Sequence, residues 1–272
     1  RFATISLKLK RLSKMPVLGS NKLTLLVSEG KWDMAMQLIR EEPNLVKERS
    51  PCPGFFGDGK VSDVFPIHQA VASFAPTNFL EQLLQIHPTS IVKEESAYRR
   101  TPLHIACKNG SSVETISFLL RQNKDCAARQ DSMGRIPLHY ALSNGDSLEI
   151  VEKLLKASPI SVGATDNGGW TPLHVACNVG LSFDVVKTLV EADKEGVITR
   201  TNNGSNPVIL ATKANSPDKE RVLEYLKKEE DEINKKTEFI RIRNAERKAT
   251  EKEKNALTVR KVGKRGSVRE LA

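Results

Sequence analysis

The 272-residue sequence contains no apolar run that approaches the roughly 18 residues of a membrane-spanning helix. Its hydrophobic content of 39% is nevertheless enough to build a buried core. The composition therefore excludes both a membrane-spanning chain and one that is disordered throughout. It indicates a soluble protein of one or two globular domains.

Cysteines are few and lack any metal-binding or redox spacing. None of the four forms a CxxC pair, and they are scattered at Cys52, Cys107, Cys126 and Cys177. In a chain of this size, such a pattern predicts reduced thiols that serve mainly in packing, in a cytoplasmic or nuclear protein.

Excess charge is absent from the body of the chain, although the net charge is +9. Residues 1–14 carry five basic and no acidic side chains, and residues 237–272 carry eleven basic and five acidic ones, which leaves residues 15–236 at −2. The first residue is Arg1. We expect residues 1–19 to be a disordered basic leader, with an organellar targeting segment over residues 1–14 as the alternative.

One motif hints at nucleotide chemistry. Residues 54–62, GFFGDGKVS, satisfy the phosphate-loop pattern G-x-x-x-x-G-K as far as Lys60. Val61 stands where a Ser or Thr hydroxyl would hold Mg²⁺. A working phosphate loop also requires a buried strand before it and a helix directly after it, so the surrounding pattern decides the question.

An internal repeat organises the chain. The segments TPLHIACKNG (101–110), IPLHYALSNG (136–145) and TPLHVACNVG (171–180) recur every 35 residues, and weaker copies begin near residues 23, 65 and 206. Thr101 and Thr171 suit a helix N-cap, the following proline suits the first helical position, and the glycine suits a helix end. A second apolar pattern with helical spacing follows each glycine. Each unit is thus predicted to be a pair of helices joined by a turn.

These motifs resemble the ankyrin repeat family, whose D-x-x-G-x-T-P-L-H-x-A signature is met nearly whole by residues 166–176 and largely by residues 131–141. The resemblance covers about residues 20–230 and implies an all-α solenoid of helix-turn-helix units with loop or hairpin fingers. The expected units are 20–50, 64–97, 98–132, 133–167, 168–202 and 203–230, the first and last being degenerate, with an insertion at 51–63. The period exceeds the usual 33 residues by two, which we assign to the turn after the glycine and to the connecting loop.

The repeated histidines do not predict a metal site. His68, His104, His139 and His174 occupy the same place in successive units. Helices of neighbouring units stack about 8–10 Å apart, whereas zinc ligands lie about 2 Å from the metal, so these rings cannot converge. The resemblance implies that they form hydrogen bonds within and between repeats. With no catalytic arrangement in view, we expect a non-catalytic protein without cofactor, metal or small-molecule substrate.

The resemblance further implies a protein partner bound at the concave face and the finger loops, by a chain that is itself monomeric. The predicted contact residues are Ile105, Tyr140 and Val175 on the first helices, Arg99, Arg100, Met133, Arg135 and Trp170 at the fingers, and Phe55 and Phe56 in the insertion. The alternative is that Ile105 and Val175 pack against neighbouring repeats and that Trp170 covers a loop.

The tail, residues 231–272, is predicted to be a charged helix or a disordered segment. Leu226, Ile233 and Ile240 keep a seven-residue spacing, but polar companions argue against a sustained coiled coil. Its basic excess suggests an alternative function, association with nucleic acid or an acidic membrane, with the repeats recruiting or regulating. Ser267 follows Lys264 and Arg265 and is a candidate phosphorylation site.

The repeat register also bears on the glycine-rich motif. The first two units lie 44 residues apart instead of 35 or 36, and residues 50–60 fall in this insertion. We expect the preceding residues 47–53, KERSPCP, to be unable to form the buried strand that a phosphate loop needs. The motif is therefore interpreted as an enlarged finger.

Overall fold

The structure is a computed structural model that describes residues 21–145 and 147–266, with the backbone alone for residues 253–266. By its internal contacts, the chain divides into two compact units after Leu223. The predicted leader segment and Ser267 lie outside the described residues.

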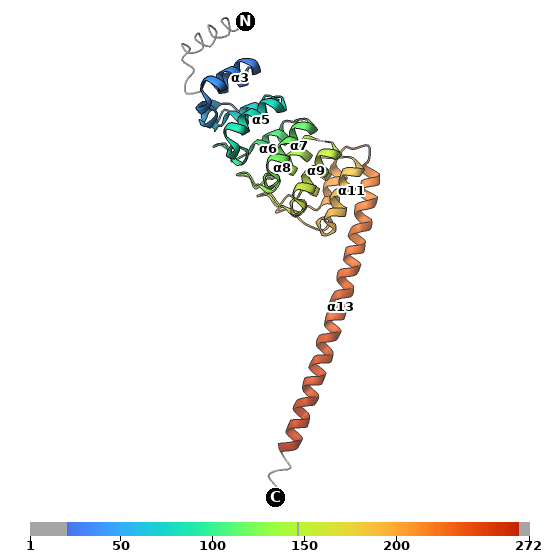
Figure 1. The fold of residues 1–272 in the computed structure, drawn as a ribbon. Helices are drawn as coiled ribbons and strands as arrows, with labels where there is room; N and C mark the ends of the chain where they lie inside the picture. The colour runs from blue at the N-terminus through green and yellow to red at the C-terminus, as the bar shows by residue number, and fades with distance from the viewer. Residues whose placement is uncertain (1–20, 146, 267–272) are drawn as a thin grey trace. The chain divides into compact units, whose positions relative to one another are not determined.

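Pairs of helices build the first unit, and Figure 1 shows them following one another in a stack. Each short helix contacts the short helix of the next pair, and α5, α7, α9 and α11 likewise follow in order as a second layer. The predicted all-α solenoid is confirmed. The pairs are α2 (Lys22–Ser28) with α3 (Trp32–Glu41), α4 (Pro66–Ala72) with α5 (Thr77–Ile86), α6 (Pro102–Lys108) with α7 (Val113–Gln122), α8 (Pro137–Asn144) with α9 (Leu148–Ala157), α10 (Pro172–Val179) with α11 (Phe183–Ala192), and α12 (Pro207–Lys213) with the start of α13 (Lys219–Gly266).

A short 3₁₀ helix follows each of the first five pairs, and the sequence reasoning missed it. Each is four or five residues long and buries one or two side chains, such as Val46 and Val162, between successive pairs. Proline opens three of them, where its fixed φ suits the first helical position. Their bounds are η1 (Pro43–Lys47), η2 (Pro88–Val92), η3 (Lys124–Ala128), η4 (Pro159–Gly163) and η5 (Lys194–Val197).

The insertion forms a β-hairpin. Strand β1 (Ser50–Pro53) pairs antiparallel with β2 (Val61–Val64), with Ser50 opposite Val64. Pairing with β2 thus gives part of segment 47–53 a strand conformation, but this is not the buried strand that a phosphate loop needs, because Ser50 alone of the four β1 residues is buried. The glycine-rich loop leads into this second strand and not into a helix, so the structure lacks the architecture of a phosphate loop here. The hairpin finger that the sequence analysis allowed for is present.

Four histidines hold successive pairs together. In each, Nδ1 accepts the backbone N–H of the N-cap residue three positions earlier, at 3.1–3.2 Å. An amide can only donate, so the ring proton of the neutral imidazole lies on Nε2. Nε2 then donates to a backbone carbonyl 25 or 31 residues later, at 2.9–3.1 Å. The expected role of these histidines within and between repeats is confirmed.

Burial keeps these rings neutral. It lowers the pKa of His68 and of His104 to about 4, and it lowers the pKa of His139 and of His174 below the usual range. Around them the core is tightly closed, with Ala106, Ala141 and Ala176 fully buried where the short helices approach each other. Cys107, Cys126 and Cys177 are buried cysteines, and burial raises the pKa of the Cys177 thiol to about 12.

Within the described part of the chain, two residues other than glycine adopt left-handed backbone conformations. Phe74, with φ of 54°, ends the turn after α4 where the equivalent residues are Gly110, Gly145 and Gly180. Its side chain is 60% exposed. The second residue, Arg99, has φ of 59°. A left-handed conformation costs a residue with a Cβ about 1 kcal/mol or more, so both positions are strained.

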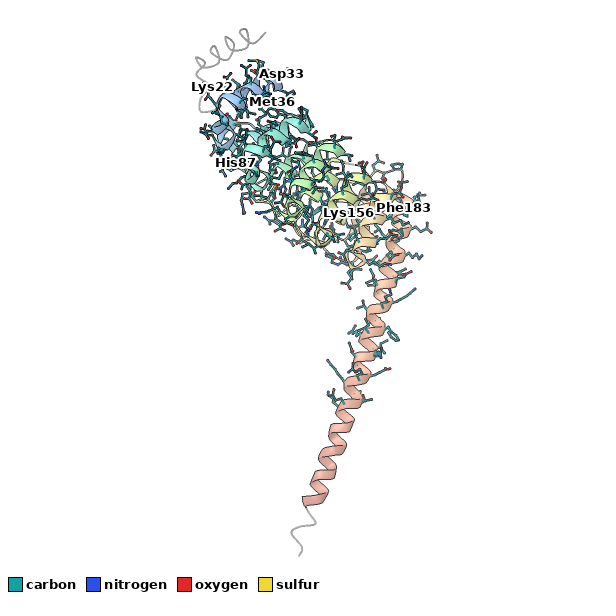
Figure 2. All side chains as sticks on the ribbon, viewed as in Figure 1. Lys22, Asp33, Met36, His87, Lys156 and Phe183 are labelled. Atoms are coloured by element: carbon teal, nitrogen blue, oxygen red, sulfur yellow. The ribbon has the colours of Figure 1, made fainter. Side chains whose placement is uncertain are left out.

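Helix α13 begins in the first unit. There Asp218 accepts the backbone N–H of Phe183, which is labelled in Figure 2, at 2.9 Å, and the Arg221 guanidinium lies 3.8 Å from the centre of the Phe183 ring. In the second unit the helical alternative predicted for the tail is observed as far as residue 266. Side chains of residues 234–252 are exposed on every side of the helix. Among the described residues, no helix is long and apolar enough to cross a membrane.

Acid is expected to destabilise the fold through His68 and His104. An unfolded histidine has a pKa of about 6.5, so below that pH the unfolded chain binds protons that the folded chain, with pKa values of about 4, does not. The free energy of unfolding should fall by about 2 kcal/mol for each ring between pH 7 and pH 5. Urea unfolding followed by circular dichroism measures this. A His104→Asn variant should show a shallower pH dependence of the free energy of unfolding. Imidazole NMR shifts of His68 and His104 that titrate near pH 6.5 in the folded wild type would contradict the neutral, buried state of these rings.

Phe74→Gly is expected to stabilise the protein by about 0.5–1 kcal/mol, because glycine adopts positive φ without the steric cost of a Cβ. Thermal and urea unfolding measure the change. Gly134→Ala is the contrasting control: its φ is +74°, and a Cβ there would lie 2.6 Å from the Asn167 Oδ1 atom and 2.9 Å from its backbone nitrogen. It should lose at least 1 kcal/mol. If Phe74→Gly and Gly134→Ala changed the free energy of unfolding equally, backbone strain at Phe74 would not explain the effect of Phe74→Gly.

Candidate functional site

The loops that lead from each 3₁₀ helix to the next short helix form a row of fingers. We call residues 48–65 the hairpin finger and refer to the others by their ranges, 93–101, 129–136, 164–171 and 199–206. Backbone hydrogen bonds join neighbouring fingers: Ser132 N to Tyr98 O at 2.8 Å, Asn167 N to Met133 O at 2.9 Å, and Asn202 N to Gly168 O at 3.0 Å. The four fingers from 93–101 onward are therefore connected through their backbones.

A carboxylate closes each of the central finger turns. One oxygen of Asp131 accepts the N–H groups of Met133 and Arg135 at 2.8 and 3.0 Å, and Asp166 does the same in the next finger. Glu95 replaces the aspartate in finger 93–101, where its buried carboxylate accepts three backbone N–H groups and the Ser62 hydroxyl. This explains the recurring aspartate before the TPLH motif, since a short side chain can cap its own turn.

The second oxygen of each aspartate binds an arginine from the preceding finger. Arg100 Nε lies 3.3 Å from Asp131 Oδ2, and Arg135 Nε lies 3.2 Å from Asp166 Oδ2. The two ion pairs repeat the same geometry 35 residues apart. The Arg100–Asp131 pair is buried, and the side chain of Arg135 is about one-third exposed. A buried pair of this kind fixes the fingers in one arrangement because breaking it would strand a charge.

Aromatic rings surround the buried arginine. The Arg100 guanidinium lies 4.7 Å from the ring centre of Phe56, 4.4 Å from that of Tyr98 and 5.0 Å from that of Tyr140. The Tyr140 hydroxyl accepts from Arg100 Nη2 at 2.9 Å and donates to Asp131 at 2.6 Å. Burial, reinforced by the donated hydrogen bond, raises the pKa of Tyr140 to about 12. The guanidinium therefore links the hairpin finger to the two fingers that follow it.

The tip of the hairpin finger presents two half-exposed aromatic rings. Phe55 and Phe56 meet edge-to-face with ring centres 4.8 Å apart, and Phe56 meets Tyr98 in the same way at 5.3 Å. The Tyr98 hydroxyl donates to Asp58, and the Lys60 ammonium lies 4.6 Å from the centre of the Tyr98 ring. This exposed aromatic tip thus rests on finger 93–101 instead of projecting freely into solvent.

The structure brings five of the predicted contact residues into this cluster: Phe55, Phe56, Arg100, Arg135 and Tyr140. Arg99 lies beside the cluster at the turn of its finger. Met133 is 40% exposed at the next turn, and Trp170, half-exposed, meets the ring of His174 with centres 6.2 Å apart.

Four predicted contact residues are buried and are therefore not exposed at the surface as a direct contact would require. Ile105, Val175, Tyr140 and Arg100 are each less than 10% exposed. The position after each repeated histidine lies where one short helix packs against the next, so Ile105 and Val175 belong to the core, as the alternative interpretation held. Arg100 and Tyr140 are covered by the hairpin finger and by each other.

Sequence reasoning missed Tyr98, Lys60 and Asp131 as parts of the site. The repeat register contains a signal for one of them, because Tyr98 lies 35 residues before Met133, a residue that was selected as a fingertip. The other two depend on the folded path of the hairpin and on which fingers touch. No alignment of the repeats alone places Lys60 over the Tyr98 ring.

The remaining surface offers less specific chemistry. Three open hollows of about 280–620 Å³ lie along the outer helices α5, α7 and α9, and charged or amide side chains such as Glu81, Arg121 and Gln122 line them. Among the described residues, no group of three or more His, Cys, Asp or Glu side chains is placed to bind a metal ion.

Comparison with known families gives one result. A family model described as "Ankyrin repeats (3 copies)" matches residues 67–166 and residues 143–237, which together exceed half of the chain. A search of curated proteins finds no match.

Removing the Tyr140 hydroxyl tests the buried network. Tyr140→Phe should lower the free energy of unfolding by about 1–3 kcal/mol, because Asp131 and Arg100 each lose a buried hydrogen-bond partner. Chemical unfolding at neutral pH measures this loss. The control, Tyr98→Phe, removes a hydroxyl whose bond to Asp58 is solvent-exposed and should cost less than about 0.5 kcal/mol. A loss at Tyr140 no larger than that at Tyr98 would contradict the network.

Proposed function

The chain belongs to the ankyrin repeat family, and we propose that it is a non-catalytic scaffold that captures a protein partner with its fingers. Ankyrin repeats generally serve as protein–protein interaction modules, and the family is typically non-catalytic. The finer proposal is that the partner contacts the hairpin finger and the two fingers that follow it.

One observation carries this proposal. Phe55, Phe56 and Tyr98 form a half-exposed aromatic cluster that is held from below by a buried guanidinium and two carboxylates. Residues of these types are those on which binding energy concentrates in protein interfaces. Because the support is rigid, ordering the cluster costs little entropy when a partner binds.

The short helices add polar positions to the proposed binding surface. Lys108 is half-exposed near the end of its short helix, and Ser143 and Asn178 are exposed on theirs, while the apolar residues that precede them are buried. We assign these positions a secondary contact role, so that the fingers supply the affinity and the short helices adjust the fit. Met133 and Trp170 extend the same surface along the next fingers.

Paired substitution of the hairpin phenylalanines tests the scaffold. The full chain carrying Phe55→Ser and Phe56→Ser should lose at least tenfold in partner capture from a lysate, while its helical circular dichroism stays that of the wild type. Phe74→Ser is the matched control, since Phe74 is also exposed but lies at a helix turn outside the fingers. It should retain capture.

Two outcomes would count against the proposal. Unchanged capture by the double variant would remove the hairpin finger from the binding surface. Capture that disappears when the lysate is treated with nuclease would instead favour the alternative function, nucleic-acid association through the basic tail.

A further inference from the structure

Helix α13 carries a group of large apolar side chains within its most exposed stretch. Residues 234–252 are exposed on every side, yet Phe239, Ile240 and Ile242 lie among them and are 66%, 57% and 50% exposed. The other apolar residues of this stretch are two alanines, at positions 245 and 249. Single exposed apolar residues are ordinary, whereas a group of them marks a contact surface.

The three side chains share one side of the helix. Successive residues of an α-helix are rotated by about 100°, so Ile242, Phe239 and Ile240 project within an arc of about 160°. Thr237 and Asn244 project from the opposite side. We call the side that presents Phe239, Ile240 and Ile242 the apolar side of α13.

The apolar side of α13 also carries a net positive charge. Four basic residues within about two turns of Phe239 project from it, Lys235, Lys236, Arg243 and Arg247. Among the described residues, no carboxylate lies within ion-pair distance, 4.0 Å, of any of the four. Within residues 234–252, the one acidic residue on this side is Glu246, since Glu238 projects away from it and pairs with Arg241 at 3.9 Å. Four cations thus outweigh one carboxylate beside the apolar group.

We propose that the apolar side of α13 binds a membrane surface that contains anionic lipids, with the helix lying parallel to that surface. Phe239, Ile240 and Ile242 enter the boundary between headgroups and acyl chains, where their apolar area leaves water. The alkyl parts of the flanking lysines and arginines lie along this boundary, and their charged ends reach the lipid phosphates. The helix does not cross the bilayer in this arrangement. The inference is independent of the scaffold function and would place the scaffold at a membrane.

A nucleic acid and a second copy of the chain fit the apolar side less well. The phosphates of a nucleic acid would engage the cations but leave both isoleucines in water, and Phe239 is the one ring in residues 234–252 on which a base could stack. Pairing with a second copy requires a continuing apolar series. The seven-residue series of Ile233 and Ile240 instead reaches Arg247 at its next step.

Replacing the apolar group tests the proposal. Full-length chain is mixed at physiological salt with vesicles of phosphatidylcholine, either pure or with about 30% phosphatidylserine, and bound protein is measured by flotation. The wild type should bind the mixed vesicles at least tenfold more tightly than the pure ones. The triple variant Phe239→Gln, Ile240→Gln and Ile242→Gln keeps the net charge and a good helix-forming side chain. It should lose at least tenfold in affinity for the mixed vesicles.

The matched control replaces three exposed apolar residues of the first unit. Val61→Gln, Phe74→Gln and Ile160→Gln act on side chains that are 55%, 60% and 82% exposed and also leave the net charge unchanged. This variant should bind the mixed vesicles within twofold of the wild type.

A second pair of variants tests the charge. Arg243→Gln with Arg247→Gln removes two cations beside the apolar group and should weaken binding to the mixed vesicles severalfold, because each cation near an anionic surface adds to the attraction. Lys153→Gln with Lys156→Gln on α9 makes the same change in net charge on another helix (Lys156 is labelled in Figure 2). It should change the affinity less than twofold.

Tryptophan scanning reports which side of the helix enters the lipid. An indole introduced by Phe239→Trp should be quenched by lipids brominated on their acyl chains, whereas one introduced by Thr237→Trp on the opposite side should not. The wild type, with Trp32 and Trp170, supplies the background emission. Equal quenching at positions 237 and 239 would contradict the assigned side.

Three other results would overturn the proposal. Unchanged vesicle binding by the triple variant would show that charge alone holds the chain at the surface. Duplex DNA that binds more tightly than the mixed vesicles, and still binds the triple variant, would assign this side to nucleic acid. A dimer in sedimentation that the triple variant abolishes would assign it to a second copy. The α13 variants leave the fingers intact, so partner capture by the fingers is tested separately from this inference.

Discussion

A neutral imidazole ring joins each of the four central helix pairs to the finger that follows it, and the rest of the first unit depends on this contact. Both ring nitrogens of His68, His104, His139 and His174 are committed, one to the start of its own helix and one to a carbonyl of the next finger. Charging the ring would turn the accepting nitrogen into a donor facing another donor. The contact therefore positions a finger only while the imidazole ring stays buried and neutral.

The histidine rings position the fingers, and ion pairs between neighbouring fingers then hold them together. Each central aspartate uses one oxygen for its own turn and the other for an arginine of the preceding finger. Both oxygens of these aspartates are therefore already bonded within the fingers. The side chains that distinguish this surface lie mainly at the finger tips. The inserted hairpin packs the ring of Phe56 against the guanidinium of Arg100, which is oriented by its ion pair with Asp131.

Much of the fold could be predicted from the sequence because the repeat acts as its own alignment. The TPLH segments placed the short helices, and the apolar spacing after each glycine placed the long ones. The 3₁₀ helices were missed because they are too short to show a periodicity, although proline at residues 43, 88 and 159 marks three of them. The burial of Ile105 and Val175 depends on how closely neighbouring pairs stack, which a single repeat does not encode. Of the candidate site, the residues Phe55, Phe56, Arg100 and Tyr140 could be selected from the sequence, but their mutual contacts arise from the folded path of the hairpin.

The prolines of β1 have a consequence for assembly. Gly54 N–H bonds to Lys60 O, so alternation along the hairpin points the backbone of Cys52 toward β2 and that of Pro51 and Pro53 away from it. The two strand positions that would offer N–H groups along the outer edge thus carry residues that have none. Another strand approaching this edge would find no N–H donors at these two positions, which a continuing ladder requires. The outer edge of β1 therefore disfavours the addition of a third strand that would extend the hairpin into a larger sheet.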